Sequence, residues 1–347
     1  MIRYRSNRRY VIPILVSGWI ILLWLVFDSH RKLGMLTNLN QNVIMTEMAI
    51  QQKITTISTD ISQIPSTNCE CPKCKKCNSM FNLIKLPRFW LALIHNDVVS
   101  EMILEKRVWE KETTNYLETF MLPGQTIVEL GANIGYYTNL MAALVGPTGK
   151  IYSYECNSDV YNLAMLSLRM NDFDHIVDMR NFAVTDHAGY FNFQYTPIAE
   201  AGNNAVNIGG SRLEPGNATD NRTLIQVRTV ALDEDLSQVS NVDWLRMDIE
   251  GAEILALKGA QTLLWSSPNI KIIMEWSLSN LRRLSNPNEF LIDMYGQGFR
   301  FYPITNTSMS NALSEKYMLK HGGGFHNYLL TRPNTYESLY ESVNNNT

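Results

Sequence analysis

Acidic side chains follow two of the apolar runs in this chain. Asp248 ends the run VDWLRMD, with Glu250 and Glu253 close behind it, and Glu275 ends the run KIIME. Carboxylates at such places can accept a proton, hold a divalent cation or bind a cationic ligand. Acids are also common at the start of a helix, because they favour that end of its dipole. Asp248 and Glu275 are therefore candidate catalytic residues that could share a divalent cation. Glu253 is assigned to a helix start, and Glu250 fits either role.

A glycine-bracketed turn, VELGANIGYYT, offers a second kind of chemistry. Gly131 and Gly135 let a ligand approach the backbone closely, and a helix follows whose start favours an anionic group. Asn133 stands where a dinucleotide-binding G-x-G-x-x-G turn has its second glycine, which disfavours a pyrophosphate ligand. Glu129 precedes the turn, and Glu155 ends the next apolar run, where an acid can accept hydrogen bonds from ribose hydroxyls. The combination favours S-adenosylmethionine, in which a sulfonium cation is attached to a nucleoside.

These residues lie at the ends of alternating strand-like and helical segments. Repeated strand–helix units predict a parallel, doubly wound α/β sheet whose ligands bind at the carboxyl ends of the strands. Two later runs, GFRFYPI and NYLLTR, are expected to add a closing antiparallel pair. The β-branched, apolar runs expected to be strands are QTIVELG, GKIYSYE, VDMRNFAV, VDWLRMD and IKIIMEW.

Several segments together resemble the FkbM family of S-adenosylmethionine-dependent O-methyltransferases. They are VWEKET, LPGQTIVELGANIGYYT, SYE, AVTD followed by Gly189, and DWLRMDIEGAE. The resemblance covers about residues 96–332 and departs from the family at Glu129, where an aspartate is more usual. It implies a class I methyltransferase, Rossmann-like fold with a seven-stranded sheet, and methyl transfer to a hydroxyl, often of a sugar.

The resemblance also implies roles for individual residues. Asp186 would lie near the adenine end of the cofactor, and Asp248 beside the methyl group and the acceptor. It does not settle whether a metal is needed, so Asp248 and Glu275 remain candidate metal ligands. The expected cofactor-binding residues are Glu129, Gly131, Asn133, Gly135, Glu155 and Asp186.

Other residues are weaker candidates for the same site. His321 and His326 flank a glycine run and are alternative bases, although a histidine beside glycines is more often a turn residue. Trp109 and Glu110 are candidates to close the cofactor pocket. Cys156 is expected to be a small buried residue.

The N-terminus predicts a membrane anchor. Arginines at positions 3, 5, 8 and 9 precede an uncharged run over residues 11–27, and seventeen helical residues just reach the thickness of the hydrocarbon layer. A cleaved signal peptide is the alternative, but bulky Trp19 and Trp24 and the absence of a small-residue cleavage site disfavour it. The basic residues before the span predict a single-pass type II protein, with a cytoplasmic tail (1–10) and a lumenal or extracytoplasmic catalytic domain.

A stem and a cysteine cluster follow the expected anchor. Isoleucines in the stem (28–68) have heptad spacing from Ile50 to Ile64, which favours a coiled coil over a lone amphipathic helix. The segment 69–79 carries cysteines at positions 69, 71, 74 and 77, and inter-chain disulfides fit it better than zinc because nine residues cannot easily wrap a tetrahedral site. Both features predict a homo-oligomer.

The remainder is expected to be a methyltransferase domain (80–335) and a flexible tail (336–347). A net charge of -3 disfavours a nucleic-acid partner. Four N-glycosylation sequons, at Asn217, Asn221, Asn306 and Asn345, agree with lumenal exposure.

The sequence therefore favours a membrane-anchored methyltransferase acting on a sugar hydroxyl of a glycan or glycoconjugate. One alternative is an NAD- or nucleotide-sugar-dependent Rossmann-fold enzyme. The other is a catalytically inactive, oligomeric membrane-surface protein.

Overall fold

The structure of the chain is a computed structural model with two compact units, Met1–Ser62 and Gln63–Thr347. The residues it describes are 10–16, 19–25, 81–198, 209–216, 223–304, 309–321 and 326–344.

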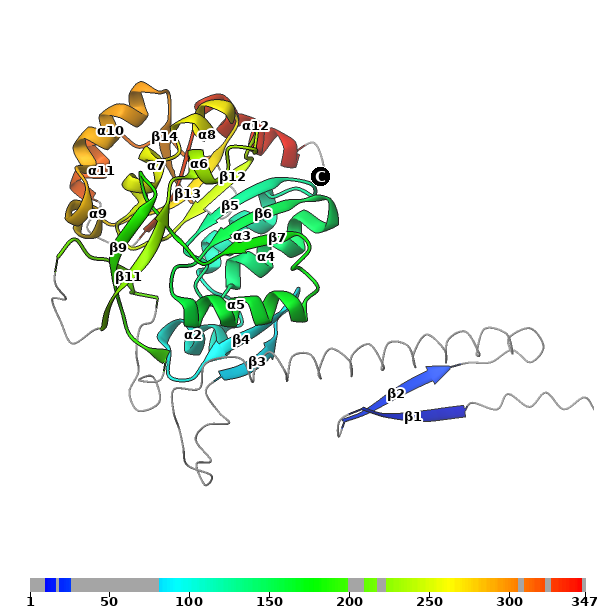
Figure 1. The fold of residues 1–347 in the computed structure, drawn as a ribbon. Helices are drawn as coiled ribbons and strands as arrows, with labels where there is room; N and C mark the ends of the chain where they lie inside the picture. Colours follow the sequence, from blue (N-terminus) through cyan, green and yellow to red (C-terminus); the bar gives the residue numbers. More distant parts are fainter. Residues whose placement is uncertain are drawn as a thin grey trace, which may run out of the picture. The chain divides into compact units, whose positions relative to one another are not determined.

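The first unit contains a β-hairpin. The prediction of a transmembrane helix over residues 11–27 is therefore wrong for the residues described there, 11–16 and 19–25. Strand β1 (Tyr10–Val16) pairs antiparallel with β2 (Trp19–Leu25) (Figure 1). The run is rich in β-branched residues and carries Pro13, and both features favour strand over helix interior. None of the helices in the described residues is both long and apolar enough to span a bilayer. The expected stem and cysteine cluster, with their coiled coil and disulfides, lie outside the described residues.

The second unit is built on a seven-stranded sheet of order β14-β15-β13-β12-β5-β6-β7. The five strands from β13 to β7 are parallel, and β15 pairs antiparallel with β13 and with β14. The doubly wound sheet and its closing antiparallel pair are thereby confirmed. The strands are β5 (Thr126–Leu130), β6 (Lys150–Tyr154), β7 (Val177–Arg180), β12 (Trp244–Met247), β13 (Lys271–Trp276), β14 (Arg300–Pro303) and β15 (His326–Thr331).

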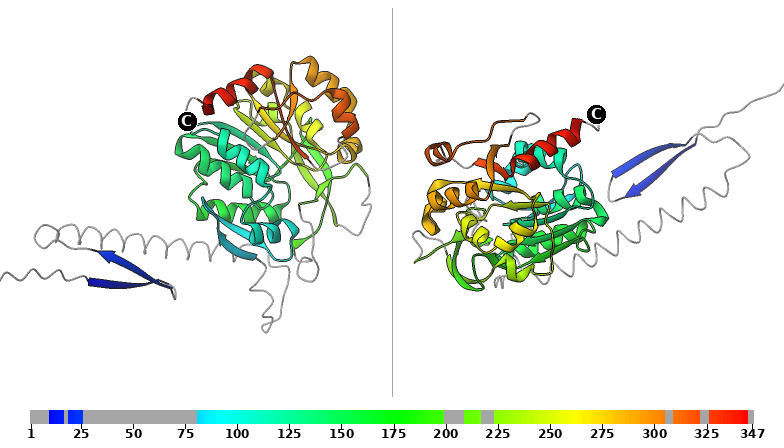
Figure 2. Two further views of the ribbon diagram at one scale, coloured as in Figure 1. Left: turned by 180° about the vertical axis from the view of Figure 1, so that it is seen from behind. Right: turned by 90° about the horizontal axis from the view of Figure 1, so that it is seen from above.

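Helices cover both faces of this sheet, as Figures 1 and 2 show. Helices α3, α4 and α5 are neighbours on one face, and α6, α7 and α8 lie on the other. Buried apolar side chains of β12 and β13 form the centre of the core between these layers. The helices are α2 (Val98–Lys106), α3 (Lys111–Phe120), α4 (Tyr136–Val145), α5 (Ser158–Met170), α6 (Leu232–Asp235), α7 (Glu253–Lys258), α8 (Gln261–Ser266), α9 (Leu278–Leu284), α10 (Pro287–Gly296), α11 (Glu315–His321) and α12 (Pro333–Asn344).

A smaller sheet of order β10-β9-β11-β8 stands beside the main one. Its core side chains Phe193, Leu213 and Val227 pack with Ala252, which follows β12. This sheet therefore forms a wall next to the carboxyl end of β12. Its strands are β8 (Ala183–Val184), β9 (Gly189–Tyr195), β10 (Arg212–Leu213) and β11 (Thr223–Val230), and a separate hairpin pairs β3 (Phe81–Lys85) with β4 (Trp90–Ile94).

Residues 336–344, assigned to a flexible tail from sequence, lie in helix α12 instead. Tyr336 stacks on Tyr302 with ring centroids 3.7 Å apart, and Tyr340 packs against Phe120 at 4.9 Å. Both tyrosines are buried. The burial of these rings stabilises the helix against the domain.

The parallel strands end in register at one edge of the sheet. Leu130 at the end of β5 is paired with Tyr154 of β6 and with Met247 of β12, and Met247 is paired with Met274 of β13. The residue following each end is therefore brought to the same edge, where open α/β sheets bind ligands.

Candidate functional site

A cavity of about 470 Å³ lies at this edge, within the size range of small-molecule sites. Side chains and backbone that follow the ends of β5, β6 and β12 line it, together with Glu275 of β13 and part of the smaller sheet. Of the expected cofactor-binding and catalytic residues, five line it: Gly131, Asn133, Glu155, Asp248 and Glu275.

Gly131 allows the loops after β5 and β12 to touch. Its φ is +81°, and a Cβ atom there would lie 2.0 Å from the backbone oxygen of Asp248. The adjacent Asp248 N–H donates to the Leu130 carbonyl at 3.1 Å. Only glycine tolerates both the conformation and the approach, so this residue holds the glycine turn against the acid at the end of β12.

Glu155, which follows β6, binds the glycine turn on the side away from Asp248. Its two carboxylate oxygens accept hydrogen bonds from the backbone N–H groups of Asn133 (2.9 Å) and Asn157 (2.8 Å). Burial raises the pKa of Glu155 to about 7. A carboxylate has about four acceptor positions, so Glu155 can still accept hydrogen bonds from the hydroxyls of a ribose in the cavity.

Next to Glu155, apolar side chains form part of the cavity lining, and this part is called the apolar wall. It is formed by Val160, Phe182, Ala183 and Val184, and by Cys156, which is half-buried and lines the cavity. Apolar side chains of this kind suit a flat heterocycle such as adenine.

Asp186 does not line this cavity. Its side chain is 38% exposed and pairs with His187 at 2.6 Å. The structure thus places Asp186 two residues beyond the wall instead of in it.

Two other predicted cofactor residues lie behind the turn. Glu129 is fully buried, and one of its oxygens accepts from the hydroxyls of Thr138 (2.6 Å) and Ser153 (2.7 Å). Gly135 precedes α4 with a φ of +82°, and a Cβ there would lie 3.0 Å from Ala164 on α5. Neither residue lines the cavity, so in this structure they support the turn from within the protein.

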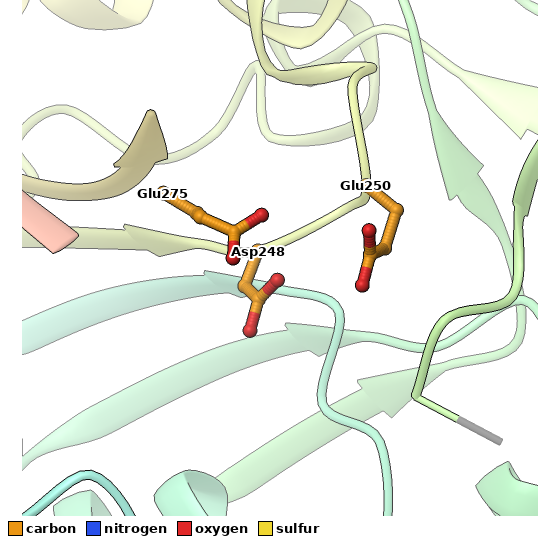
Figure 3. A group of neighbouring side chains, drawn as sticks. All are labelled: Asp248, Glu250 and Glu275. Carbon is orange, nitrogen blue, oxygen red and sulfur yellow. The ribbon is translucent and has the colours of Figure 1, made fainter. Parts of the chain in front are cut away.

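Three carboxylates converge at the other end of the cavity. Asp248, Glu250 and Glu275 each place an oxygen within 4.8 Å of the others, a spacing that could hold a divalent cation (Figure 3). Burial raises the pKa of Glu275 to about 9, and the negative charge of Asp248 adds to the shift. Glu275 is therefore protonated at neutral pH when no cation is present. Glu250, for which the sequence allows a role in the site or at the helix start, belongs to this cluster.

Arg246, which sequence reasoning missed, is the cationic partner of the cluster. It is 4% exposed and donates to Asp248 at 2.8 Å and to the Gly131 carbonyl at 3.0 Å. Its guanidinium also lies 4.4 Å from the ring centroid of Tyr137. The available signal was its place two residues before Asp248, since alternate residues of a strand share a face. Arg246 thus binds one of the two carboxylate oxygens of Asp248.

Glu253 organises the loop between the cluster and α7. It is 1% exposed, and its carboxylate accepts from the backbone N–H groups of Ile249 (2.9 Å) and Gly251 (3.0 Å). Between them, Glu250 has a φ of +53°, an unusual conformation for a residue other than glycine. The predicted helix-start role of Glu253 thus includes holding the loop that aims Glu250 into the cavity.

Trp109 and Glu110, expected to close the pocket, both line it. Glu110 accepts from the Tyr137 hydroxyl at 2.8 Å and from the Asn327 amide at 2.9 Å. Burial and the nearby Asp248 raise its pKa. The alternative base His326 is exposed and lies outside the lining. Nothing is described for the side chain of His321.

The donor set fits a nucleoside that carries positive charge. Glu155 offers acceptors for ribose hydroxyls beside an apolar wall, and Glu110 and Asp248 place carboxylates near the glycine turn, where a sulfonium and an ammonium group would be stabilised. Around the glycine turn, these carboxylates outnumber the one buried arginine, Arg246, which disfavours a diphosphate at that end of the cavity. The residues present therefore fit S-adenosylmethionine.

Parts of this sequence are similar to known proteins. Residues 129–301 match the methyltransferase FkbM domain. A protein-L-isoaspartate O-methyltransferase from Methanococcoides burtonii is 30% identical over 79 residues, which is 22% of this chain and 39% of that protein. The catalytic subunit of a tRNA (adenine(58)-N(1))-methyltransferase from Yarrowia lipolytica is 33% identical over 55 residues, 16% of this chain and 14% of that protein. The match thus spans well under two thirds of either relative.

A solved structure, an O-methyltransferase from Bacillus cereus in complex with SAH, aligns with a TM-score of 0.37 and 13% identity, covering 66% of this chain and 88% of that one. The FkbM domain match contains the glycine turn, Glu155 and the clustered carboxylates Asp248, Glu250 and Glu275. The chain belongs to the FkbM family of S-adenosylmethionine-dependent methyltransferases.

Proposed function

We propose that the protein transfers a methyl group from S-adenosylmethionine to a hydroxyl of a sugar in a glycan or glycoconjugate. The observation that carries the proposal is the contact between Gly131 and Asp248, because it joins the turn that fits the cofactor to the acid that would face the acceptor. Carboxylates on that side of the cavity are good acceptors for sugar hydroxyls.

The residues of the chain divide the work of the transfer. S-adenosylmethionine supplies an electrophilic methyl group when bound. The acceptor hydroxyl must be held in line with it and must lose its proton. Asp248 takes that proton, while Arg246 fixes the carboxylate by donating to its other oxygen. Glu275, protonated at neutral pH, donates a hydrogen bond that orients the acceptor. Trp109 and Glu110 limit the access of water from the side of the glycine turn.

Calorimetry and measurements of turnover test these assigned roles. The full-length chain should bind S-adenosylmethionine, and Asp248→Asn should keep that affinity within about threefold while turnover falls by about 10²–10⁴, the usual contribution of a general base. Methylated sugars, measured by mass spectrometry in cells with the wild type and with Asp248→Asn, report turnover. Asp174→Asn is the matched control, since Asp174 is an exposed acid away from the cavity.

Other results would point elsewhere. Failure to bind S-adenosylmethionine would refute the proposal, and binding of NAD in its place would favour the dinucleotide alternative. Binding without methylated product in the wild type would favour an inactive surface protein. Turnover that is lost with a chelator and restored by Mg²⁺ or Mn²⁺ would assign Asp248, Glu250 and Glu275 to a divalent cation that lowers the acceptor's pKa.

We also propose that the apolar segment 11–27 attaches the protein to a membrane, with the catalytic domain on the lumenal or extracytoplasmic side. Four arginines before an uncharged run support this proposal. Alkaline carbonate should leave the chain in the membrane pellet, and protease outside sealed vesicles should spare the catalytic domain. Reducing and non-reducing gels would show whether cysteines 69–77 link copies of the chain, as expected for a homo-oligomer.

A further inference from the structure

Two arginines share one carboxylate at the wall formed by the smaller sheet. Arg212 of β10 lies 3.6 Å from Glu214, and Arg283 of α9 lies 3.2 Å from the same carboxylate. Arg283 also donates to the carbonyl of Leu213 at 2.7 Å. Glu214 is buried, whereas both arginine side chains are about one fifth exposed. The group thus has two positive charges and one negative charge.

Arg212 is the less satisfied of the two arginines. Its contact with Glu214 is longer than a hydrogen bond, and its Nε is buried without a hydrogen-bond partner in the described part of the chain. A guanidinium has five N–H donors in a planar fork. Burial, with the nearby positive charge of Arg212, lowers the pKa of Arg283. Both observations indicate positive charge that Glu214 does not fully compensate.

This positive charge lies at the end of the cavity where Asp248, Glu250 and Glu275 converge, which is the end proposed for the acceptor. Arg212 is part of the lining, together with Glu250 and Asn280. Arg283 connects the arginine pair to the acid cluster, because it donates to the backbone carbonyl of Glu250 at 3.4 Å. An acceptor whose hydroxyl faces Asp248 would therefore extend past Glu250 toward Arg212.

We propose that the acceptor carries an anionic group, a carboxylate or a phosphate, which the guanidinium of Arg212 binds. This inference rests on the proposed function and names the class of acceptor for the same site. The planar fork of arginine matches both groups in a bidentate geometry, and such charge-assisted hydrogen bonds are about twice as strong as neutral ones. A neutral sugar would leave the charge of Arg212 without this partner.

Three sugars provide the test. Full-length protein is first saturated with S-adenosylhomocysteine, and glucose, glucuronate and glucose 6-phosphate are then titrated into it by calorimetry. Glucuronate, glucose 6-phosphate or both should bind at least about tenfold more tightly than glucose, as expected for charge-assisted pairing. A preference for glucuronate alone would identify a carboxylate, and a preference for glucose 6-phosphate alone would identify a phosphate.

Variants identify the residue responsible. Arg212→Gln should reduce the preference to within about threefold, whereas Arg212→Lys should keep part of it because lysine retains the charge but lacks the fork. Arg282→Gln is the matched control: it removes one positive charge from an exposed site beside Arg283 and should leave the preference unchanged. Binding of S-adenosylhomocysteine by each variant confirms that it is folded.

Equal binding of the three sugars, no binding of any of them, or a preference that survives Arg212→Gln would overturn the inference. If the wild type fails to bind S-adenosylhomocysteine, the proposed function itself fails. The two failures are therefore distinguishable.

Discussion

Replacing Glu253 by glutamine should remove the contribution of this residue to the pH dependence of the domain's stability while damaging the site. The carboxyl group of Glu253 is 1% exposed, and burial raises its pKa from 4.5 to about 7. The folded protein therefore holds a proton on Glu253 at a pH where the unfolded chain has lost it. Stability from this group is complete below about pH 4.5 and is lost as the pH rises through about 7.

The size of the effect follows from the two pKa values. Fully ionising Glu253 in the folded state costs about 3 kcal/mol, since each pKa unit corresponds to about 1.4 kcal/mol. Between pH 5 and pH 9, the linkage relation gives a loss of about 2.5 kcal/mol in the free energy of unfolding from this residue. Glutamine does not titrate, so the stability of Glu253→Gln relative to wild type should rise by about this amount over the same range.

Urea unfolding of both proteins at pH 5 and pH 9, followed by tryptophan fluorescence, measures this difference. Trp244 and Trp276 are almost fully buried and report on the core. Glu155 and Glu275 also titrate with raised pKa values, but they do so in both proteins, and their contributions cancel. The exposed acid Glu101 supplies a control, and Glu101→Gln should follow the wild-type curve.

The stability of Glu253→Gln relative to wild type should rise with pH, whereas its turnover should fall below that of the wild type. An amide oxygen can accept from one of the two backbone N–H groups that Glu253 now binds, while the amide nitrogen faces the other. The loop should relax, and methyl transfer should fall even at pH 9. Parallel stability curves for wild type and Glu253→Gln would refute the assigned pKa, and unchanged turnover would refute the role in the loop.

Three further variants test other parts of the site. Gly131→Ala should lower the free energy of unfolding by well over the roughly 1–2 kcal/mol that a left-handed conformation alone costs, because its Cβ would lie 2.0 Å from a backbone oxygen. Gly298, with a φ of +89° and open space around it, is the control, and Gly298→Ala should lower that free energy only by about 1–2 kcal/mol in urea unfolding. Glu155→Gln should weaken calorimetric binding of S-adenosylhomocysteine about tenfold at pH 8 but little at pH 6, because Glu155 ionises at about pH 7 and its charged form is the stronger acceptor. Glu275→Gln should keep turnover at pH 7 within about threefold, since a neutral amide replaces a neutral carboxyl group. A loss above about 100-fold, matched by chelation of the wild type, would instead make Glu275 a metal ligand.

The edge of the sheet was predictable because its signals are local. Apolar runs that end in an acid or a glycine turn place Gly131, Glu155, Asp248 and Glu275 at the carboxyl ends of parallel strands, and the register brings these ends together. The conformation of Glu250 was not predictable in this way. It depends on two hydrogen bonds made by a residue three positions later.

Long-range contacts explain the other differences. Strand β10 of the smaller sheet is only two residues long, and its wall residue Arg212 is placed by the pairing of β10 with β9. Helix α12 is polar along much of its length, and two buried tyrosines fix it to the domain. The apolar N-terminal run satisfied a length rule for helices while its composition favoured strands.

The acids of the motif DIEGAE differ in burial, and this difference accounts for their chemistry. Asp248 and Glu250 reach the cavity, whereas Glu253 is enclosed by protein. Two neighbouring N–H groups need an acceptor with two free oxygens, and among side chains of this length only a carboxylate supplies both without a competing donor. Its desolvation costs about 3 kcal/mol once it is ionised. The hydrogen bonds that Glu253 accepts offset this cost by fixing the loop. In the fixed loop Glu250 keeps a φ of +53°, and one of its carboxylate oxygens lies within 4.8 Å of oxygens of Asp248 and Glu275.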